Sequence, residues 1–163
     1  MIPKTLRNFN AYVDGVGYIG IVQEGTPPAL ALQVEEYQGG GMIAPVDISM
    51  ASVEKMNFDL TFKEFNPAIL GLFGHDDVPL TLRGAMGPDN EAVIIETRGL
   101  IRSTNQDGWK PGKDSAVLKI EATPTYYKQT VNGEEVIEID AVNMIFRSGG
   151  IDHLAGMKAA LGA

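Results

Sequence analysis

The sequence Met56-Asn57-Phe58-Asp59-Leu60-Thr61-Phe62-Lys63 alternates apolar and polar side chains with a period of two throughout. Successive side chains of a β-strand point to opposite faces, so this period predicts a strand with one face in a core and one face in water. No other stretch of the chain shows the pattern as clearly. It indicates that the fold is built mainly from half-buried strands.

The same alternation continues on both sides of this stretch. It predicts strands over residues 30–35 and 78–83, and again over 118–123, while residues 92–102 are rich in β-branched side chains. Pro124 follows directly, and a proline has no backbone N–H for a sheet. We therefore expect an edge position or a bulge at Pro124, with long, bent strands around it.

Two dipeptides, Asn132-Gly133 and Asp14-Gly15, predict tight hairpins because these residues accept the positive φ angles of such turns. The strands that the turns would join are 126–130 with 136–144, and 11–13 with 18–22, the last pair ended by Pro27-Pro28. Seven or so strands are expected in all.

The sequence predicts little helix. Asn66-Pro67 combines a capping residue with a proline suited to the first turn, which predicts a short helix over 68–73 that stops before Gly74. A helical turn is expected near the C-terminus, between Asp152 and Leu161. We predict a single domain over residues 1–163, an antiparallel β-sandwich or barrel with one flanking short helix and this C-terminal turn.

Composition narrows the function. The 163 residues hold 13 Lys and Arg against 21 Asp and Glu, a formal net charge of −8, which disfavours an electrostatic grip on nucleic acid. The chain has no cysteine, so it has no disulfide, no thiolate nucleophile and no cysteine zinc site. Neither a signal peptide nor a long apolar run is seen, so we expect synthesis in the bacterial cytoplasm.

Residues 39–54 form the longest stretch that we read as irregular, and they are apolar. Met42, Ile43, Val46, Ile48 and Met50 would be unfavourable in water. The sequence leaves two alternatives: the loop folds back over its own core, or it docks onto another subunit.

Catalytic and cofactor patterns are missing from the sequence. His75 and His153 are far apart and in no metal-binding motif, so surface positions are expected, and no serine lies in Gly-x-Ser-x-Gly. Glu138 and Asp140 share a strand face, which indicates a solvated face rather than a cation site. We predict no enzyme activity, no cofactor and no metal. Trp109, beside the basic turn Lys110-Pro111-Gly112-Lys113, is expected to be a packing anchor.

Five short segments of the sequence occur together in an order and spacing that resembles the tail tube proteins of P2-like contractile phages and of R-type pyocins. The segments are Tyr37-Gln38-Gly39-Gly40-Gly41-Met42 with Ala44-Pro45-Val46-Asp47; Thr81-Leu82-Arg83-Gly84-Ala85-Met86; Gly108-Trp109-Lys110-Pro111-Gly112; Tyr126-Tyr127 through Asn132-Gly133 to Glu138-Ile139-Asp140 and Asn143-Met144; and Gly149-Gly150-Ile151-Asp152. The resemblance spans nearly the whole chain.

The resemblance implies a structural subunit that forms hexameric rings, which stack into a rigid hollow tube driven through the target cell envelope when the sheath contracts. It implies that residues 39–54, with the N-terminal residues, contact the neighbouring ring. The inter-ring contact residues would be Gly39, Gly40, Gly41, Met42, Ile43, Ala44, Pro45, Val46 and Asp47. Closing sheets around a ring would also hide strand edges that a monomer exposes.

A tube needs a wet channel wall. The polar strand faces that are candidates to line it are Asn57, Asp59, Thr61, Lys63, Lys119, Glu121 and Thr123. A wall with more acids than bases would let DNA slide past without binding. The implied partners are further copies of the chain, the sheath, the baseplate and tail terminator proteins, a tape measure protein in the lumen during assembly, and DNA in passage if the particle is a phage. The implied location is a virion tail or a secreted tail-like particle.

Two alternatives stay open at this point. One is an Hcp-like tube protein of type VI secretion, which shares the expected tail-tube architecture. The other is a monomeric β-barrel binding module, with residues 39–54 as a lid over a ligand.

Overall fold

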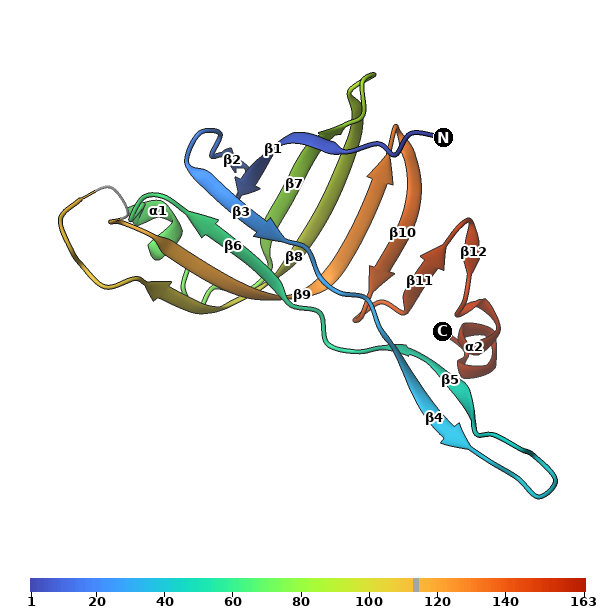
Figure 1. Cartoon of the computed structure of the whole chain (residues 1–163). Coiled ribbons are helices and arrows are strands. Elements are labelled where there is room, and N and C mark those ends of the chain that lie inside the picture. The colour runs from blue at the N-terminus through green and yellow to red at the C-terminus, as the bar shows by residue number, and fades with distance from the viewer. Residues whose placement is uncertain (113–114) are drawn as a thin grey trace.

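The computed structural model describes residues 1–112 and 115–163 and is built almost entirely of antiparallel strands (Figure 1). The strands are β1 (Leu6–Val13), β2 (Val16–Gly17), β3 (Val22–Thr26), β4 (Leu32–Tyr37), β5 (Val46–Val53), β6 (Phe58–Phe62), β7 (Val78–Met86), β8 (Glu91–Gln106), β9 (Leu118–Val131), β10 (Glu134–Asp140), β11 (Ile145–Ser148) and β12 (Ile151–Asp152). The two helices are α1 (Pro67–Leu70) and α2 (Ala155–Leu161). The predicted fold class is confirmed.

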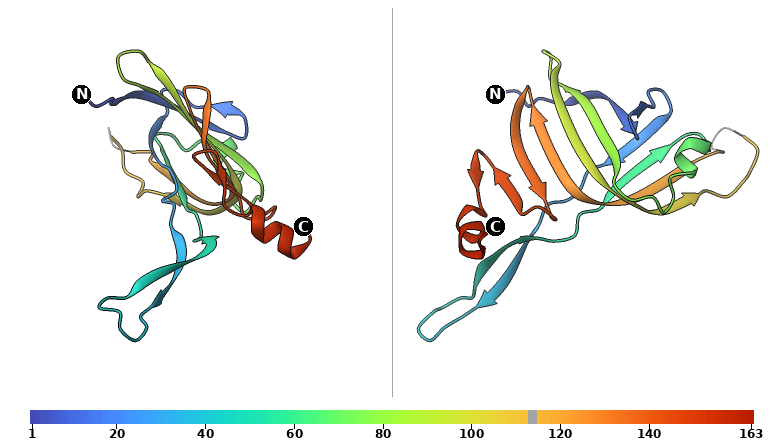
Figure 2. Two further views of the ribbon diagram at one scale, coloured as in Figure 1. Left: turned by 90° about the vertical axis from the view of Figure 1, so that its right-hand side faces the viewer. Right: turned by 180° about the vertical axis from the view of Figure 1, so that it is seen from behind.

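A ten-stranded sheet forms the body of the molecule. Its main path runs β12-β11-β10-β9-β8-β7-β1-β2, and β6 branches from β9 and pairs with β3 on its other side. Since β3 also approaches β1, the strands β1, β7, β8, β9, β6 and β3 curl into a partly closed barrel. β4 and β5 pair only with each other, and this second sheet stands apart from the barrel as an arm (Figure 2).

The core fills the inside of this barrel. In the alternating stretch 56–63, the apolar residues Phe58, Leu60 and Phe62 are at most 1% exposed, as the alternation predicts. They pair with the alternating residues of β9, because Phe58 lies opposite Ala122 and Leu60 opposite Ile120. The polar residues between them face outward, so β6 and β9 present one apolar and one polar face.

The bulge predicted at Pro124 is confirmed. β8 and β9 stay paired, but Arg98 lies opposite Tyr126 and Gly99 opposite Pro124, so Thr125 is an extra residue in β9. At this bulge β9 exchanges one edge partner, β6, for another, β10. A Cβ atom at Gly99 would lie 2.4 Å from the Cα atom of Pro124, so only glycine fits there.

The two predicted hairpin turns are confirmed, but two predicted strands are wrong. Asn132-Gly133 and Asp14-Gly15 have the expected positive φ angles. Instead of one strand over 18–22, the chain turns at residues 19–21, and the strand pattern resumes only at β3. The strand expected over 136–144 ends at Asp140, because the Asp140 carboxylate accepts hydrogen bonds from the backbone of Val142 and Asn143 and holds a turn.

The helices are shorter than expected. The side chain of Asn66 accepts a hydrogen bond from the backbone of Ala68 at the start of α1, as predicted, but the helix ends at Leu70, with Gly71 as its C-cap. α2 begins at Ala155 rather than Asp152 and ends at Leu161, with Gly162 as its C-cap at a left-handed φ of 73°.

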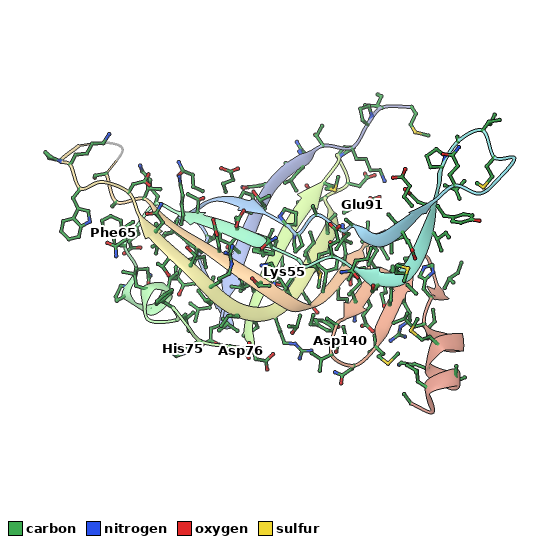
Figure 3. All side chains as sticks on the ribbon, turned by 90° about the horizontal axis from the view of Figure 1, so that it is seen from below. Lys55, Phe65, His75, Asp76, Glu91 and Asp140 are labelled. Atoms are coloured by element: carbon green, nitrogen blue, oxygen red, sulfur yellow. The ribbon has the colours of Figure 1, made fainter. Side chains whose placement is uncertain are left out.

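Trp109, expected to be a packing anchor, lies in the loop before β9 and is 81% exposed, so it packs at the surface and not in the core. Its indole stacks on Phe65 with ring centroids 5.7 Å apart, at the end of the barrel far from the arm (Figure 3). The predicted basic turn reaches Lys113, which lies outside the described residues. His75 and His153 are both exposed, as expected.

Candidate assembly surface

The arm, residues 32–53, is the largest departure from an ordinary soluble surface. Its apolar side chains lie outside any core: Val34, Val46, Ile48 and Met50 are each about half exposed, at 46% to 50%, and Tyr37 is 54% exposed. The register places Tyr37 opposite Val46, and Glu35 opposite Ile48. Since opposed residues share a face, one face of the arm is largely apolar.

The other face of the arm carries a like-charge pair. Glu36 lies directly opposite Asp47 in the register, and two carboxylates in that relation repel each other. The sequence offers no local compensation, because no Lys or Arg occurs anywhere from Asn8 to Glu54. The arm therefore combines apolar surface with uncompensated negative charge.

The predicted inter-ring residues form the tip of this arm. Residues 39–45 are a turn in which Met42 donates a backbone hydrogen bond to the carbonyl of Gly39, and Gly41 has a positive φ of 84°. The tip leaves Ile43 fully exposed. Val46 and Asp47 begin β5, so the prediction of an irregular stretch up to residue 54 is wrong: only its first part is a loop. The alternative in which this segment folds back over its own core is also wrong.

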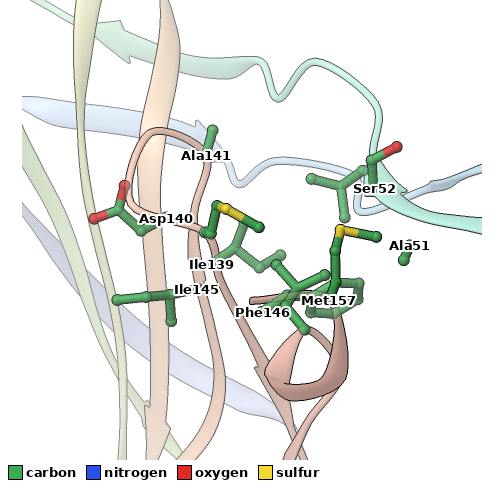
Figure 4. Close-up of a pocket in the computed structure, with 11 residues that line it drawn as sticks. Ala51, Ser52, Ile139, Asp140, Ala141, Ile145, Phe146 and Met157 are labelled. Atoms are coloured by element: carbon green, nitrogen blue, oxygen red, sulfur yellow. The ribbon is translucent and has the colours of Figure 1, made fainter. Parts of the chain in front are cut away.

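The base of the arm is anchored to the body. Val53 packs on the core, the backbone of Glu54 bonds to Ala31, and a β-bulge at residues 50–52 includes Ala51 with a positive φ of 55°. A cleft of about 260 Å³ separates this base from β10, β11 and α2. Its apolar lining includes Phe146 and Met157, which faces the arm, whereas the Asp140 carboxylate points away (Figure 4).

Four of the seven candidate channel residues come together on one surface: Asp59 lies opposite Glu121, and Thr61 opposite Lys119, on the outer face of β6 and β9. Asn57, Lys63 and Thr123 continue the same alternation in the sequence, but the hydroxyl oxygen of Thr123 is buried. Arg102 of β8 joins them through an ion pair of 2.8 Å to Glu121. Partial burial raises the pKa of Asp59, and the nearby Glu121 carboxylate adds to the rise, whereas Arg102 opposes it.

Sequence reasoning missed a second polar face, on the outer side of β8 to β12. Residues of alternating charge lie opposite one another across these five strands, in the order Glu96, Lys128, Glu138, Arg147 and Asp152. Their opposite signs stabilise the register. The Asn132-Gly133 hairpin alone would place Lys128 opposite Ile137, and Glu138 becomes its partner only because the register shifts by one residue between Glu135 and Ile137. The partners on β8 and β11 depend on longer-range register.

Glu138 and Asp140 lie on this second face and are both buried. The prediction that they form a solvated face is therefore wrong. Glu138 accepts hydrogen bonds from Tyr126 and from Arg147, at 3.1 and 2.6 Å. Burial raises the pKa of Tyr126 to about 12, together with the Glu138 hydrogen bond. Burial alone would raise the pKa of Asp140, but hydrogen bonds from Asn143 and Val142 outweigh it and hold that pKa below its ordinary 3.8.

Within residues 1–112 and 115–163, no group of three or more acidic or histidine side chains is arranged to hold a metal ion. Among the same residues, neither helix has the length and apolar character needed to cross a membrane.

Comparisons with known proteins agree on one family. The family model described as phage tail tube protein FII matches residues 3–162. The tail tube protein of Escherichia phage P2 is 29% identical, over 99% of this chain and 98% of the relative, and the major tail tube protein of Serratia phage KSP20 is 29% identical over 91% and 90%.

Solved structures of contractile injection systems share the fold at low identity. The cap of the anti-feeding prophage, a tube-terminating protein, superposes with a TM-score of 0.64 at 10% identity, covering 80% of this chain and 93% of its own. A protein of the sheath-tube complex of an extracellular contractile injection system gives 0.63 at 11% identity, with 79% and 92% covered.

Proposed function

Since the chain belongs to the phage tail tube protein FII family and is a structural subunit of a tail tube, we propose that its copies close into rings of six that stack into the tube. The arm is the observation that carries this proposal. A monomer would leave Tyr37, Val46 and Ile48 about half exposed, and covering the exposed half of Val46 or of Ile48 is worth about 1 kcal/mol. Residues 39–47 at its tip are the proposed contacts with the neighbouring ring.

The same proposal assigns the partners and the place of the protein. The tube would lie inside a contractile sheath, end at baseplate and terminator proteins, enclose a tape measure protein during assembly, and belong to a virion tail or tail-like particle. Tube neighbours of this fold come from a sheath-tube complex and a tube-terminating cap, which supports such surroundings. The role is mechanical and needs no catalysis.

We propose that the outer face of β6 and β9 lines the channel. Its seven residues hold two acids, Asp59 and Glu121, and two bases, Lys63 and Lys119, so the acid excess that would repel DNA is not met by these residues alone. Equal numbers of opposite charges give a polymer neither a strong grip nor a strong barrier. Passage through such a channel would be passive.

Electron microscopy of the purified chain, with mass measurement by light scattering, tests the assembly. We expect rings or tubes that grow with concentration. Serine at Met42, Ile43 and Val46 should stop stacking but leave rings intact, whereas serine at Val142 and Leu161, which are exposed outside the arm, should leave both unchanged. A folded monomer at every concentration would overturn the proposal.

A further inference from the structure

Packing at the base of the arm leaves the direction of the arm open. Val53 of β5 packs on the core, and two open clefts, of about 260 and 200 Å³, adjoin it. Ile139 and Phe146 line both clefts, and the larger one separates the arm from Met157 of α2 (Figure 4). Close packing fixes the relative position of two elements, so a base with two clefts beside it has room to pivot on the body.

The backbone at this base is irregular in a way that does define a direction. Leu32 lies opposite Val53, and Val34 lies opposite Ser49, so residues 50–52 of β5 face Gln33 alone. A β-bulge of this kind bends its strand and increases the local twist, which changes the direction of the strand beyond it. The bulge therefore determines the angle between the arm and the barrel, because the packing does not.

Ala51 lies at the centre of the bulge with a positive φ of 55°. Among residues 1–112 and 115–163, every other residue with a positive φ lies outside the strands. This conformation is unfavourable for a residue with a Cβ atom, so it persists only where its surroundings hold it. Two hydrogen bonds do so: Ala51 N–H donates to Oγ of Ser49 at 3.2 Å, and Ser52 Oγ donates to Oε1 of Gln33 at 2.8 Å across the bulge.

We propose that Ala51 is a positioning residue for assembly: its left-handed conformation shapes the bulge, and the bulge gives the arm the direction that stacking requires. The inference rests on the proposed stacking of rings and adds the residue that fixes its geometry. The tip of the arm, residues 39–45, is far along the hairpin from this joint, so a small change of angle at residue 51 displaces the tip by a much larger distance.

The direction of the arm can be measured in the single subunit, because the chain has no cysteine of its own. Spin labels on Ile43→Cys, at the tip, and on Glu64→Cys, in the loop after β6, report their separation by pulsed electron paramagnetic resonance at concentrations too low for assembly. In this background Ala51→Gly should leave the mean separation unchanged, because glycine accepts the same φ. Ala51→Val should shift the mean or broaden the distribution, because a β-branched residue is strongly disfavoured at positive φ.

Two results would overturn the role of Ala51: an unchanged distribution in Ala51→Val, or the same shift in Ala51→Val and Ala51→Gly. If Ala51→Val does not fold, Ser52→Ala takes its place, since it removes the hydrogen bond to Gln33. It should broaden the distribution, and a distribution as narrow as that of the unmodified arm would contradict the proposal.

Assembly of the same substitutions without labels gives the second reading. Ala51→Val should raise the concentration at which tubes form by about tenfold, and Ala51→Gly should not. Ala68→Val is the matched control, because it adds the same two methyl groups at an exposed residue of α1. A redirected arm that still forms tubes at the unmodified concentration would contradict the positioning role. Absence of tubes from the unmodified chain would defeat the proposed function, and the separation of the labels would then decide alone whether Ala51 sets the direction of the arm.

Discussion

β6 in the barrel and β5 in the arm have the same alternating pattern but opposite surroundings. Phe58, Leu60 and Phe62 of β6 are at most 1% exposed, whereas Val46, Ile48 and Met50 of β5 are each about half exposed. The difference is the presence of a partner, because β6 faces the other wall of a barrel and β5 faces open solvent. Alternation thus indicates a strand with an apolar face without saying which chain covers that face.

The largest expected effect comes from the barrel side of this comparison. Leu60 is 1% exposed, so Leu60→Ala leaves a cavity in the core and should lower the free energy of unfolding by about 2–5 kcal/mol. Urea denaturation measures this loss at protein concentrations too low for the chain to assemble. A loss under about 1 kcal/mol would show that β6 is not part of a close-packed core.

The second prediction concerns the bulge in β9, at which this strand changes its edge partner from β6 to β10. Gly99→Ala places a methyl group 2.4 Å from backbone atoms of Thr123 and Pro124, which cannot move without breaking the bulge. We expect a loss of about 1–3 kcal/mol. Gly108→Ala is the matched control, since nothing lies within 4 Å of its added methyl group. Similar stability of the two variants would argue against the bulge geometry.

These two positions show what the sequence could predict. The core of β6 follows from period two alone, and the bulge follows from the missing N–H of Pro124. The end of β10 does not follow, because Ala141-Val142-Asn143-Met144 has little turn signal and the turn depends on the Asp140 side chain. β5 was hidden for another reason: its alternation begins directly after three glycines and a proline, which are typical of a loop.

The candidate site divides in the same way. The apolar character of residues 42–50 is visible in the sequence, since it depends on residue type only. The cleft at the base of the arm is not visible, because Ser52, Ile139 and Met157 come from three separate elements, β5, β10 and α2, that only the complete fold brings together. The opposed carboxylates Glu36 and Asp47 likewise became a pair only with the register of the arm.

The third prediction uses the pH dependence of the turn after β10. The pKa of Asp140 is lowered by hydrogen bonding, so the charged carboxylate stabilises the fold above pH 3.8, and this contribution is lost as the pH falls from 3.8 through the lowered pKa. Asp140→Asn should cost about 1–2 kcal/mol at pH 7 and remove that part of the acid dependence. Denaturation at pH 7, 4 and 3 tests both effects, and an unchanged slope in the variant would contradict the assignment.

The smallest effect on unfolding should come from the arm. Ile48→Ala removes a side chain of the same size as Leu60→Ala does, but Ile48 is 46% exposed and lies in the part of the arm beyond Val53, which is the residue that packs on the core at the base of the arm. Its free energy of unfolding in the monomer should change by less than about 0.5 kcal/mol. In the assembled tube the same substitution should increase the concentration needed for stacking, because there the arm face is covered. Measuring both quantities on one variant separates the two roles: a large loss in the monomer would mean that the arm is held by its own chain, and no change in either would mean that this face of the arm has no partner.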